Sequence, residues 1–194
     1  MLPPRQQRVY PDFDTIDRRY NIILCDPPWS FRVHRNDNNG TRNAQYFYKT
    51  MTDQDIINLP IRKISADDCA LFLWVVSPNL LLLSDIFTAW DFEFKTVAFV
   101  WVKTYPNSTK LRLGLGHYTR AGSESCFLAT RGRPKVISHS VKQVIVAPYT
   151  RHSEKPTEIR DRIVQLYGDI PRIELFARTT TEGWDALGDE LVTS

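Results

Sequence analysis

The chain of 194 residues has too few cysteines for a disulfide-stapled protein and too short an apolar run for a membrane-spanning one. Its three cysteines, Cys25, Cys69 and Cys126, match no metal-ligand spacing, and their odd number leaves at least one unpaired. The longest uncharged run covers residues 69–84, short of the roughly 20 residues that span a bilayer. The first residues carry charges and prolines where a secretory signal would be apolar. We therefore expect a cytoplasmic protein with reduced, buried thiols and no membrane segment.

Signatures of several enzyme classes are also missing. Gly114 and Gly116 are followed by Thr119 where a dinucleotide-binding fingerprint has its third glycine. No Walker A, His-Glu-x-x-His or Gly-x-Ser-x-Gly sequence occurs, and the four histidines are dispersed, so we expect no metal site. No repeat, low-complexity tract or Gly/Ser linker divides the chain. The sequence predicts a single domain over residues 1–194, with residues 1–19 as an N-terminal extension.

Positive charge is concentrated in one part of the chain. The formal net charge is only +3, but residues 103–155 contain ten Lys or Arg against two acidic residues. This segment therefore carries +8 and the remainder −5. Such asymmetry is typical of a protein face that attracts polyanions. Solvated charges spread around the fold would give the same excess of Lys and Arg in this segment.

Apolar runs of strand length alternate with helical patterns along the chain. The run at residues 21–25 ends at Pro27 and Pro28, which cannot continue a ladder, and Thr52 with Asp55 resembles a helix start. Ser77 and Pro78 fit the N-cap and first position of a helix. The predicted elements are strands at 21–25, 70–76, 95–103, 126–129, 144–146 and 172–176, and helices beginning at 52, covering 77–90 and covering 156–167. This alternation predicts an α/β fold, with a mostly parallel sheet, helices on both faces, and ligands at the carboxyl ends of the strands.

The sequence Asp26-Pro27-Pro28-Trp29 follows the first predicted strand directly. The exocyclic amine of a nucleobase is a poor nucleophile because its lone pair is delocalised into the ring. If Asp26 accepts one N–H and the rigidly held Pro27 carbonyl accepts the other, the nitrogen moves towards tetrahedral geometry and its lone pair becomes available. Trp29 would offer the base a stacking face, worth roughly 1–3 kcal/mol.

A purely structural interpretation of the same four residues is a turn that ends a strand and buries its tryptophan. The position at the carboxyl end of a strand favours the catalytic interpretation, because active sites of α/β folds lie there. Cys25 adjoins Asp26, but neighbouring strand residues point to opposite faces. We therefore interpret Cys25 as a packing residue rather than a nucleophile.

With these motifs the chain resembles the MT-A70-like N6-adenine methyltransferases. The resemblance covers roughly residues 20–191, and its specificity lies in the order and spacing of many short matches. Besides the Asp-Pro-Pro-Trp motif, the matches are Tyr48-Lys49-Thr50-Met51-Thr52, Leu71-Phe72-Leu73-Trp74, Val100-Trp101-Val102-Lys103, Gly116-His117-Tyr118 with Arg120 and Glu124, Arg131-Gly132, Lys155-Pro156, Glu174-Leu175-Phe176-Ala177-Arg178 and Gly183-Trp184.

The resemblance implies a Rossmann-like methyltransferase fold and S-adenosyl-L-methionine as cofactor. It assigns Lys155 to the methionine carboxylate and Asp26 to both the target amine and the donor's ammonium. A solvated surface charge is the alternative for Lys155. The other implied cofactor-binding residues are Phe176, Arg178, Thr180, Thr181, Asp189 and Glu190. Asp189 stands where Asn is common in the family, and the Thr180-Thr181 pair also departs from the pattern of better-known relatives.

On the substrate side, the resemblance implies that residues 32–43 and 106–122 form loops that close over the base. The residues it places near the base or the phosphates are Trp29, His117, Tyr118, Arg120, Glu124, Arg131, Arg133 and Lys135. The last three would add affinity without reading sequence. A second copy of the chain in a homodimer, or a separate partner subunit, would supply further contacts to the nucleic acid.

The expected activity is therefore adenine-specific methylation of DNA. DNA is favoured by analogy with short bacterial or phage members of the family. The alternatives are N6-methylation of adenosine in RNA, a non-catalytic scaffold subunit that binds nucleic acid and, more distantly, methylation of a protein glutamine amide. A scaffold member of this family typically loses the catalytic Asp or the aromatic residue, whereas this chain keeps both.

Overall fold

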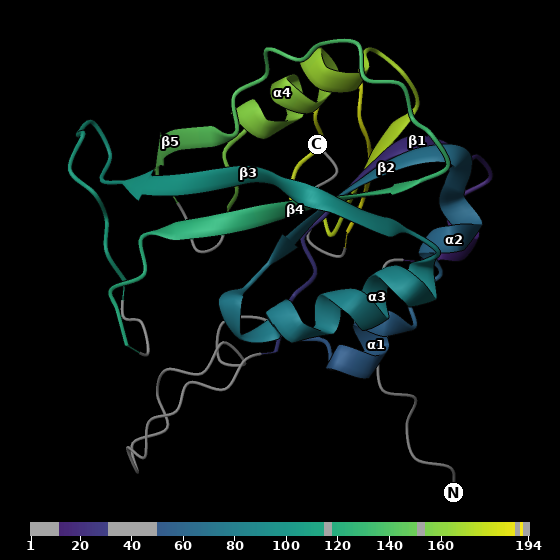
Figure 1. The fold of residues 1–194 in the computed structure, drawn as a ribbon, viewed down its shortest axis with the longest axis horizontal. Helices are drawn as coiled ribbons and strands as arrows, with labels where there is room; N and C mark the ends of the chain where they lie inside the picture. Colours follow the sequence, from purple (N-terminus) through teal and green to yellow (C-terminus); the bar gives the residue numbers. More distant parts are fainter. Residues whose placement is uncertain (1–11, 31–49, 115–117, 151–153, 189–190, 192–194) are drawn as a thin grey trace, which may run out of the picture.

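The computed structural model describes residues 12–30, 50–114, 118–150, 154–188 and 191. A seven-stranded sheet with the order β5-β3-β4-β2-β1-β6-β7 forms its centre (Figure 1). β4 pairs antiparallel with both its neighbours, and the other four pairings are parallel. The strands are β1 Tyr20–Cys25, β2 Ser65–Val75, β3 Glu93–Thr104, β4 Ser123–Arg131, β5 Val144–Pro148, β6 Arg172–Leu175 and β7 Asp185–Leu187. The α/β class and the mostly parallel sheet are confirmed.

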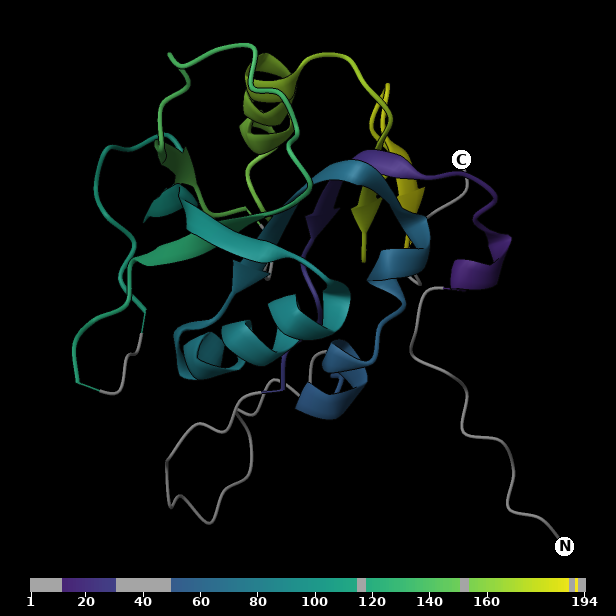
Figure 2. The same ribbon diagram turned by 45° about the vertical axis from the view of Figure 1, so that its right-hand side comes forward.

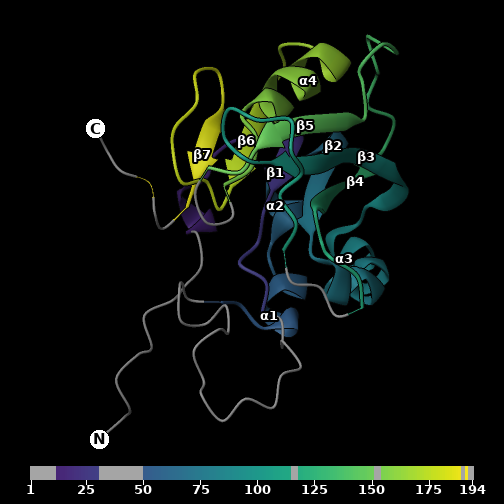
Figure 3. The same ribbon diagram turned by 90° about the vertical axis from the view of Figure 1, so that its left-hand side faces the viewer.

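Helices cover both faces of this sheet. One face carries α1 and α3 and the opposite face carries α4, as the views in Figures 1 and 2 agree. β6 and β7 lie at one end of the sheet (Figure 3). The helical segments are η1 Phe13–Thr15, α1 Asp53–Ile57, α2 Ile61–Ile64, η3 Ser77–Leu82, α3 Leu83–Trp90 and α4 Glu158–Tyr167. No helix in the described ranges is long and apolar enough to cross a membrane.

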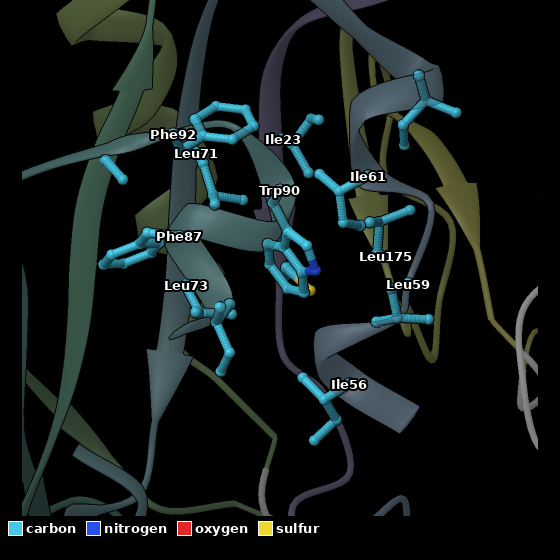
Figure 4. Packing of buried hydrophobic residues seen from close by; sticks show 14 of the residues in the cluster. Ile23, Ile56, Leu59, Ile61, Leu71, Leu73, Phe87, Trp90, Phe92 and Leu175 are labelled. Carbon is cyan, nitrogen blue, oxygen red and sulfur yellow. The ribbon is translucent and has the colours of Figure 1, made fainter. Parts of the chain in front are cut away.

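Residue alternation along the central strands builds a separate core on each face. In β1, Ile23 and Cys25 pack with the helices α1 to α3, whereas Ile22 and Leu24 pack beneath α4. The first core surrounds Trp90 of α3 (Figure 4). Burial on both faces explains why residues 22–25 of β1 and 69–75 of β2 are apolar without a break rather than alternating. Cys25 is confirmed as a packing residue, and all three cysteines are buried and unpaired, with burial raising the pKa of Cys69 to about 12.

One predicted helix start is confirmed, another is wrong, and the predicted strands at 70–76 and 126–129 prove longer, as β2 and β4. Thr52 forms the expected capping box with Asp55 at the start of α1. Ser77 is not an N-cap, because Val76 occupies that position and the first turn is the 3₁₀ helix η3, which passes into α3 at Leu83. The sequence analysis missed η1, α2 and β7, which have only three or four residues each and show no clear period.

Candidate active site

The carboxyl ends of β1, β2, β3 and β6 meet the amino end of β4 at one edge of the sheet. Strand pairing sets Cys25 beside both Leu73 and Leu175, and Trp74 beside Cys126. Because β4 runs in the opposite direction, it brings its first residues to this edge instead of its last. The side chains that follow β1 and β6 therefore lie close to those that open β4.

The turn after β1 is held by three hydrogen bonds. The backbone N–H of Trp29 donates to the Pro27 carbonyl at 2.8 Å, and the N–H of Met51 donates to the Pro28 carbonyl at 2.9 Å. The indole Nε1–H of Trp29 donates to the Trp74 carbonyl at 2.9 Å, which fastens the turn to the end of β2. The Trp29 side chain is buried and belongs to the core beneath α1 to α3. The structure thus gives Trp29 the structural role considered as an alternative, while base stacking stays a prediction.

Four alternating charges form a network beside this turn. Lys155 Nζ lies 2.6 Å from Asp26 Oδ2 and 3.2 Å from Glu124 Oε2. The other oxygen of Glu124, Oε1, pairs with Lys103 Nζ. These side chains are mostly buried, with exposed fractions of 10% for Lys155 and 29% for Asp26. In the described part of the chain no hydrogen bond reaches Asp26 Oδ1, so this oxygen can accept one from a ligand.

Burial and pairing act in opposite directions on these groups. Burial raises the pKa of Asp26 above its ordinary value, and the adjacent Lys155 offsets only part of that rise. Burial also opposes ionisation of Glu124, but Lys155 and Lys103 together hold its pKa below the usual range. Burial would lower the pKa of Lys155, but Asp26 and Glu124 raise it, so Lys155 carries its full charge. The site contains an ammonium shared between two carboxylates.

The whole sheet and this network fall within one family match. The model of the MT-A70 family matches residues 20–190. The chain belongs to the MT-A70 family of N6-adenine methyltransferases. It is 32% identical to the type II methyltransferase M.MunI of Mycoplasma sp. over 194 aligned residues, which cover 90% of this chain and 78% of the relative.

Other MT-A70 relatives are longer than this chain. It is 30% identical to the human N(6)-adenosine-methyltransferase catalytic subunit METTL3, over 89% of this chain and 28% of METTL3. The Drosophila melanogaster N(6)-adenosine-methyltransferase MT-A70-like protein is 29% identical, over 91% of this chain and 28% of that protein. The chain thus spans just over a quarter of the length of these two relatives.

Four of the expected cofactor-binding residues follow β6. Phe176 is half-buried and has a φ of 61°, in the left-handed region that aromatic residues rarely adopt. Such backbone strain is found most often at functional sites. Arg178 lies near enough to lower the pKa of Asp26. Thr180 is exposed and Thr181 is half-buried, bridging to Trp184 across the next turn.

Other predicted residues are exposed or not placed. Tyr118 and Arg120 are exposed to solvent on the segment between β3 and β4. His117, Asp189 and Glu190 lie outside the described residues. The whole predicted substrate loop at 32–43 also lies outside them, as do residues 115–117 of the predicted loop at 106–122. Among the described residues, no group of three or more His, Cys, Asp or Glu side chains is placed to hold a metal ion.

The structure does not bring the basic segment after β4 to the site. β4 carries the chain away from Glu124 over seven residues, about 24 Å, to Arg131 at the opposite edge of the sheet. There the Arg131 guanidinium lies 3.3 Å from Asp91, and the backbone N–H of Arg133 donates to Asp68 at 2.7 Å. Phosphate binding by Arg131, Arg133 and Lys135 stays a prediction, but it would act far from Asp26.

The sequence analysis missed several residues at the site. Lys103 pairs with Glu124, and its ammonium lies 5.0 Å from the centre of the Trp101 ring and 5.6 Å from that of Tyr149. The guanidinium of Arg112 lies over the same tyrosine at 3.5 Å. The signal available in the sequence was the two-residue spacing of Trp101 and Lys103, which puts both on one face of β3.

Proposed function

We propose that this chain uses S-adenosylmethionine to methylate the N6 amine of adenine in DNA. The observation that carries the proposal is Asp26 at the tip of β1. Lys155 holds one oxygen of its carboxylate, and the other is left without a hydrogen bond in the described part of the chain. A carboxylate in this state can accept an N–H from a base amine.

The donor set at this edge fits the proposed cofactor. S-adenosylmethionine, when bound, supplies an electrophilic methyl group on a sulfonium sulfur, which departs as a neutral thioether. Its amino-acid end carries an ammonium and a carboxylate, whose charges are opposite to those of the Asp26 carboxylate and the Lys155 ammonium. The indole N–H of Trp74, buried at the same edge, has no hydrogen-bond partner among the residues that the structure describes, so a polar group of a ligand would satisfy it. We propose Phe176 and Arg178 as further contacts.

The reaction requires Asp26 to act on the amine and requires no covalent intermediate with the protein. Asp26 Oδ1 accepts one N–H, and the Pro27 carbonyl, which already accepts the Trp29 N–H through one lone pair, accepts the second through its other lone pair. Both contacts draw the nitrogen lone pair out of conjugation. The new nitrogen–carbon bond uses that lone pair, and the surplus proton on nitrogen passes to Asp26 Oδ1, whose raised pKa favours its uptake.

Two features of the relatives favour DNA over RNA as substrate. The chain spans 78% of a relative named a type II methyltransferase, but just over a quarter of a relative named an N(6)-adenosine-methyltransferase catalytic subunit. A target adenine within a duplex would have to be flipped out at a cost of a few kcal/mol. A homodimer or a partner subunit that adds grip on the nucleic acid stays a prediction, which sedimentation with and without DNA would test.

Transfer of a labelled methyl group to matched DNA and RNA oligonucleotides, followed by nucleoside analysis, tests this function. We expect N6-methyladenine in DNA, and we expect Asp26→Ala to abolish it without changing the melting temperature. Label found only in RNA or in cytosine would refute the assignment. A calorimetric titration with S-adenosylmethionine tests the scaffold alternative, because a scaffold would show no saturable heat.

A further inference from the structure

Lys103 is a half-buried cation at the active-site edge that touches neither Asp26 nor Lys155 in the contacts described. Its side chain is 17% exposed, and its partner Glu124 is 22% exposed. On β3, Lys103 lies two residues beyond Trp101, which is paired directly with Glu124 of β4. Lys103 and Glu124 are therefore diagonal neighbours on one face of the sheet, a spacing that long side chains bridge.

The position of Lys103 is fixed from several sides. Its backbone N–H donates to the Gly122 carbonyl at 2.9 Å, and its carbonyl accepts from the N–H of Arg112 at 2.8 Å. Its ammonium approaches the faces of Trp101 and Tyr149, whose rings stack with an interplanar angle of 8°. A cation–π contact at a desolvated site is worth up to about 2 kcal/mol. Lys103 is thus a rigid anchor for whatever it binds.

From this geometry we propose that Lys103 is a positioning residue for methyl transfer. It holds Glu124 Oε1, so that Glu124 Oε2 keeps Lys155 in place between the two carboxylates and Asp26 stays an ionised acceptor. The inference rests on the function proposed above, and it concerns a residue that acts only through Glu124 and Lys155.

Charge balance explains how Lys103 acts on Asp26 from a distance. Two carboxylates and two ammonium groups cancel in the network, so loss of Lys103 leaves one surplus negative charge in a mostly buried site. Glu124 then has Lys155 as its single cation in the network and draws it away from Asp26. The unbalanced charge of Glu124 also opposes ionisation of Asp26. The other titratable or charged groups that interact electrostatically with Asp26 are Cys25, Cys126 and Arg178.

The pH dependence of kcat/KM tests this role in the full chain. We expect Lys103→Met to move the acidic limb of the profile upward by about one pH unit, the lower end of what a nearby charge produces. Turnover at a pH on that limb should therefore fall about tenfold, whereas Lys103→Arg restores the wild-type profile. The matched control is Lys95→Met, because Lys95 pairs with Glu93 at 2.7 Å at the other end of the same strand. Lys95→Met should leave the profile unchanged.

Donor binding gives a second measurement that does not depend on turnover. Calorimetric titration with S-adenosylmethionine across the same pH range should show a matching upward shift for Lys103→Met, because Asp26 contacts the donor's ammonium only when ionised. Melting curves at each pH identify loss of folding, and Lys103→Gln replaces the methionine variant if that one fails to fold.

The possible outcomes separate this inference from the proposed function. An unshifted profile in Lys103→Met, or equal loss at every pH in the Met and Arg variants, would overturn the positioning role. Absence of methyl transfer to adenine by the wild-type chain would overturn the proposed function instead. In that event the pH dependence of donor binding still decides whether Lys103 acts on Asp26.

Discussion

Replacement of Asp26 by Asn should separate catalysis from stability. Asn keeps the shape of the side chain and one oxygen, but it loses the charge that attracts Lys155 and acts on the amine. Burial raises the pKa of Asp26 more than Lys155 lowers it, so the ionised carboxylate destabilises the folded state at neutral pH. Asp26→Asn should therefore lose turnover without losing stability.

The expected magnitudes follow from the contacts that remain. One acceptor at the reacting amine is worth about 10²–10³ in kcat, or about 2.7–4 kcal/mol, by comparison with single groups that stabilise transition states. Lys155 keeps Glu124 at 3.2 Å, so no unpaired ammonium is left, and the free energy of unfolding should change by less than about 1 kcal/mol. Lys155→Met is the contrasting variant. It leaves two buried carboxylates without their shared cation, at a cost of about 3–5 kcal/mol.

The sign of the pH dependence is fixed by the raised pKa. The carboxyl of Asp26 favours the folded state below its ordinary pKa of 3.8, and this contribution is lost as pH rises through the folded-state value. The stability of Asp26→Asn relative to wild type should therefore rise from pH 4 to pH 8. Urea unfolding across this range and labelled methyl transfer measure the two effects. Destabilisation at pH 8 by more than about 2 kcal/mol, or turnover within about tenfold of wild type, would refute the reasoning.

Three further substitutions test how the scaffold holds the site. Trp29→Phe removes the buried hydrogen bond to the Trp74 carbonyl and leaves a small cavity, so urea unfolding should show a loss of about 2–3 kcal/mol with a parallel loss of activity. Arg160→Met leaves Glu174 buried without its two hydrogen bonds of 2.7 and 2.9 Å, and should lower the free energy of unfolding by about 3–5 kcal/mol. Gly132→Ala forces a side chain onto a φ of 63° and against a backbone carbonyl of β2, and should lower the melting temperature through a loss of about 1–3 kcal/mol.

Matched variants control for two of these three changes. Lys63→Met breaks an exposed pair with Asp14 and should cost less than about 1 kcal/mol, in contrast to Arg160→Met. Gly114→Ala adds a Cβ at an ordinary contact distance, 3.4 Å from the Ala121 carbonyl, and should be nearly neutral. A Trp29→Phe variant as stable as wild type would show that the indole bond does not fasten the turn.

The sequence predicted those strands and helix ends that are determined by residues close together in the chain. The unbroken apolar runs of β1 and β2 indicated strands buried on both faces, and the capping pair Thr52 and Asp55 marked a helix start. The direction of β4 was not predictable in this way. An apolar strand has the same composition whether it runs parallel or antiparallel to its neighbours, and only pairing with β2 and β3 decides the direction.

In the candidate site, too, motifs were predictable from the sequence, whereas contacts set by strand pairing were not. Asp26 and Lys155 were predicted from motifs, and the structure brings them within 2.6 Å although 129 residues separate them. Lys103 was missed because its role arises from a diagonal contact between strands that no local pattern records. Arg131 was predicted to contact phosphates on the substrate side, but β4 takes it to the far edge.

The antiparallel direction of β4 also determines which part of the chain can vary without disturbing the charge network. Because β3 runs towards the catalytic edge and β4 runs away from it, the connection between them leaves and re-enters the fold at that edge (Figures 1 and 2). Lengthening or replacing this connection changes the surface at that edge, while the strand register that aligns Lys103 with Glu124 is preserved. Evolution, or an engineer, can therefore vary what this edge binds by exchanging one loop, without altering Asp26 or its charge network.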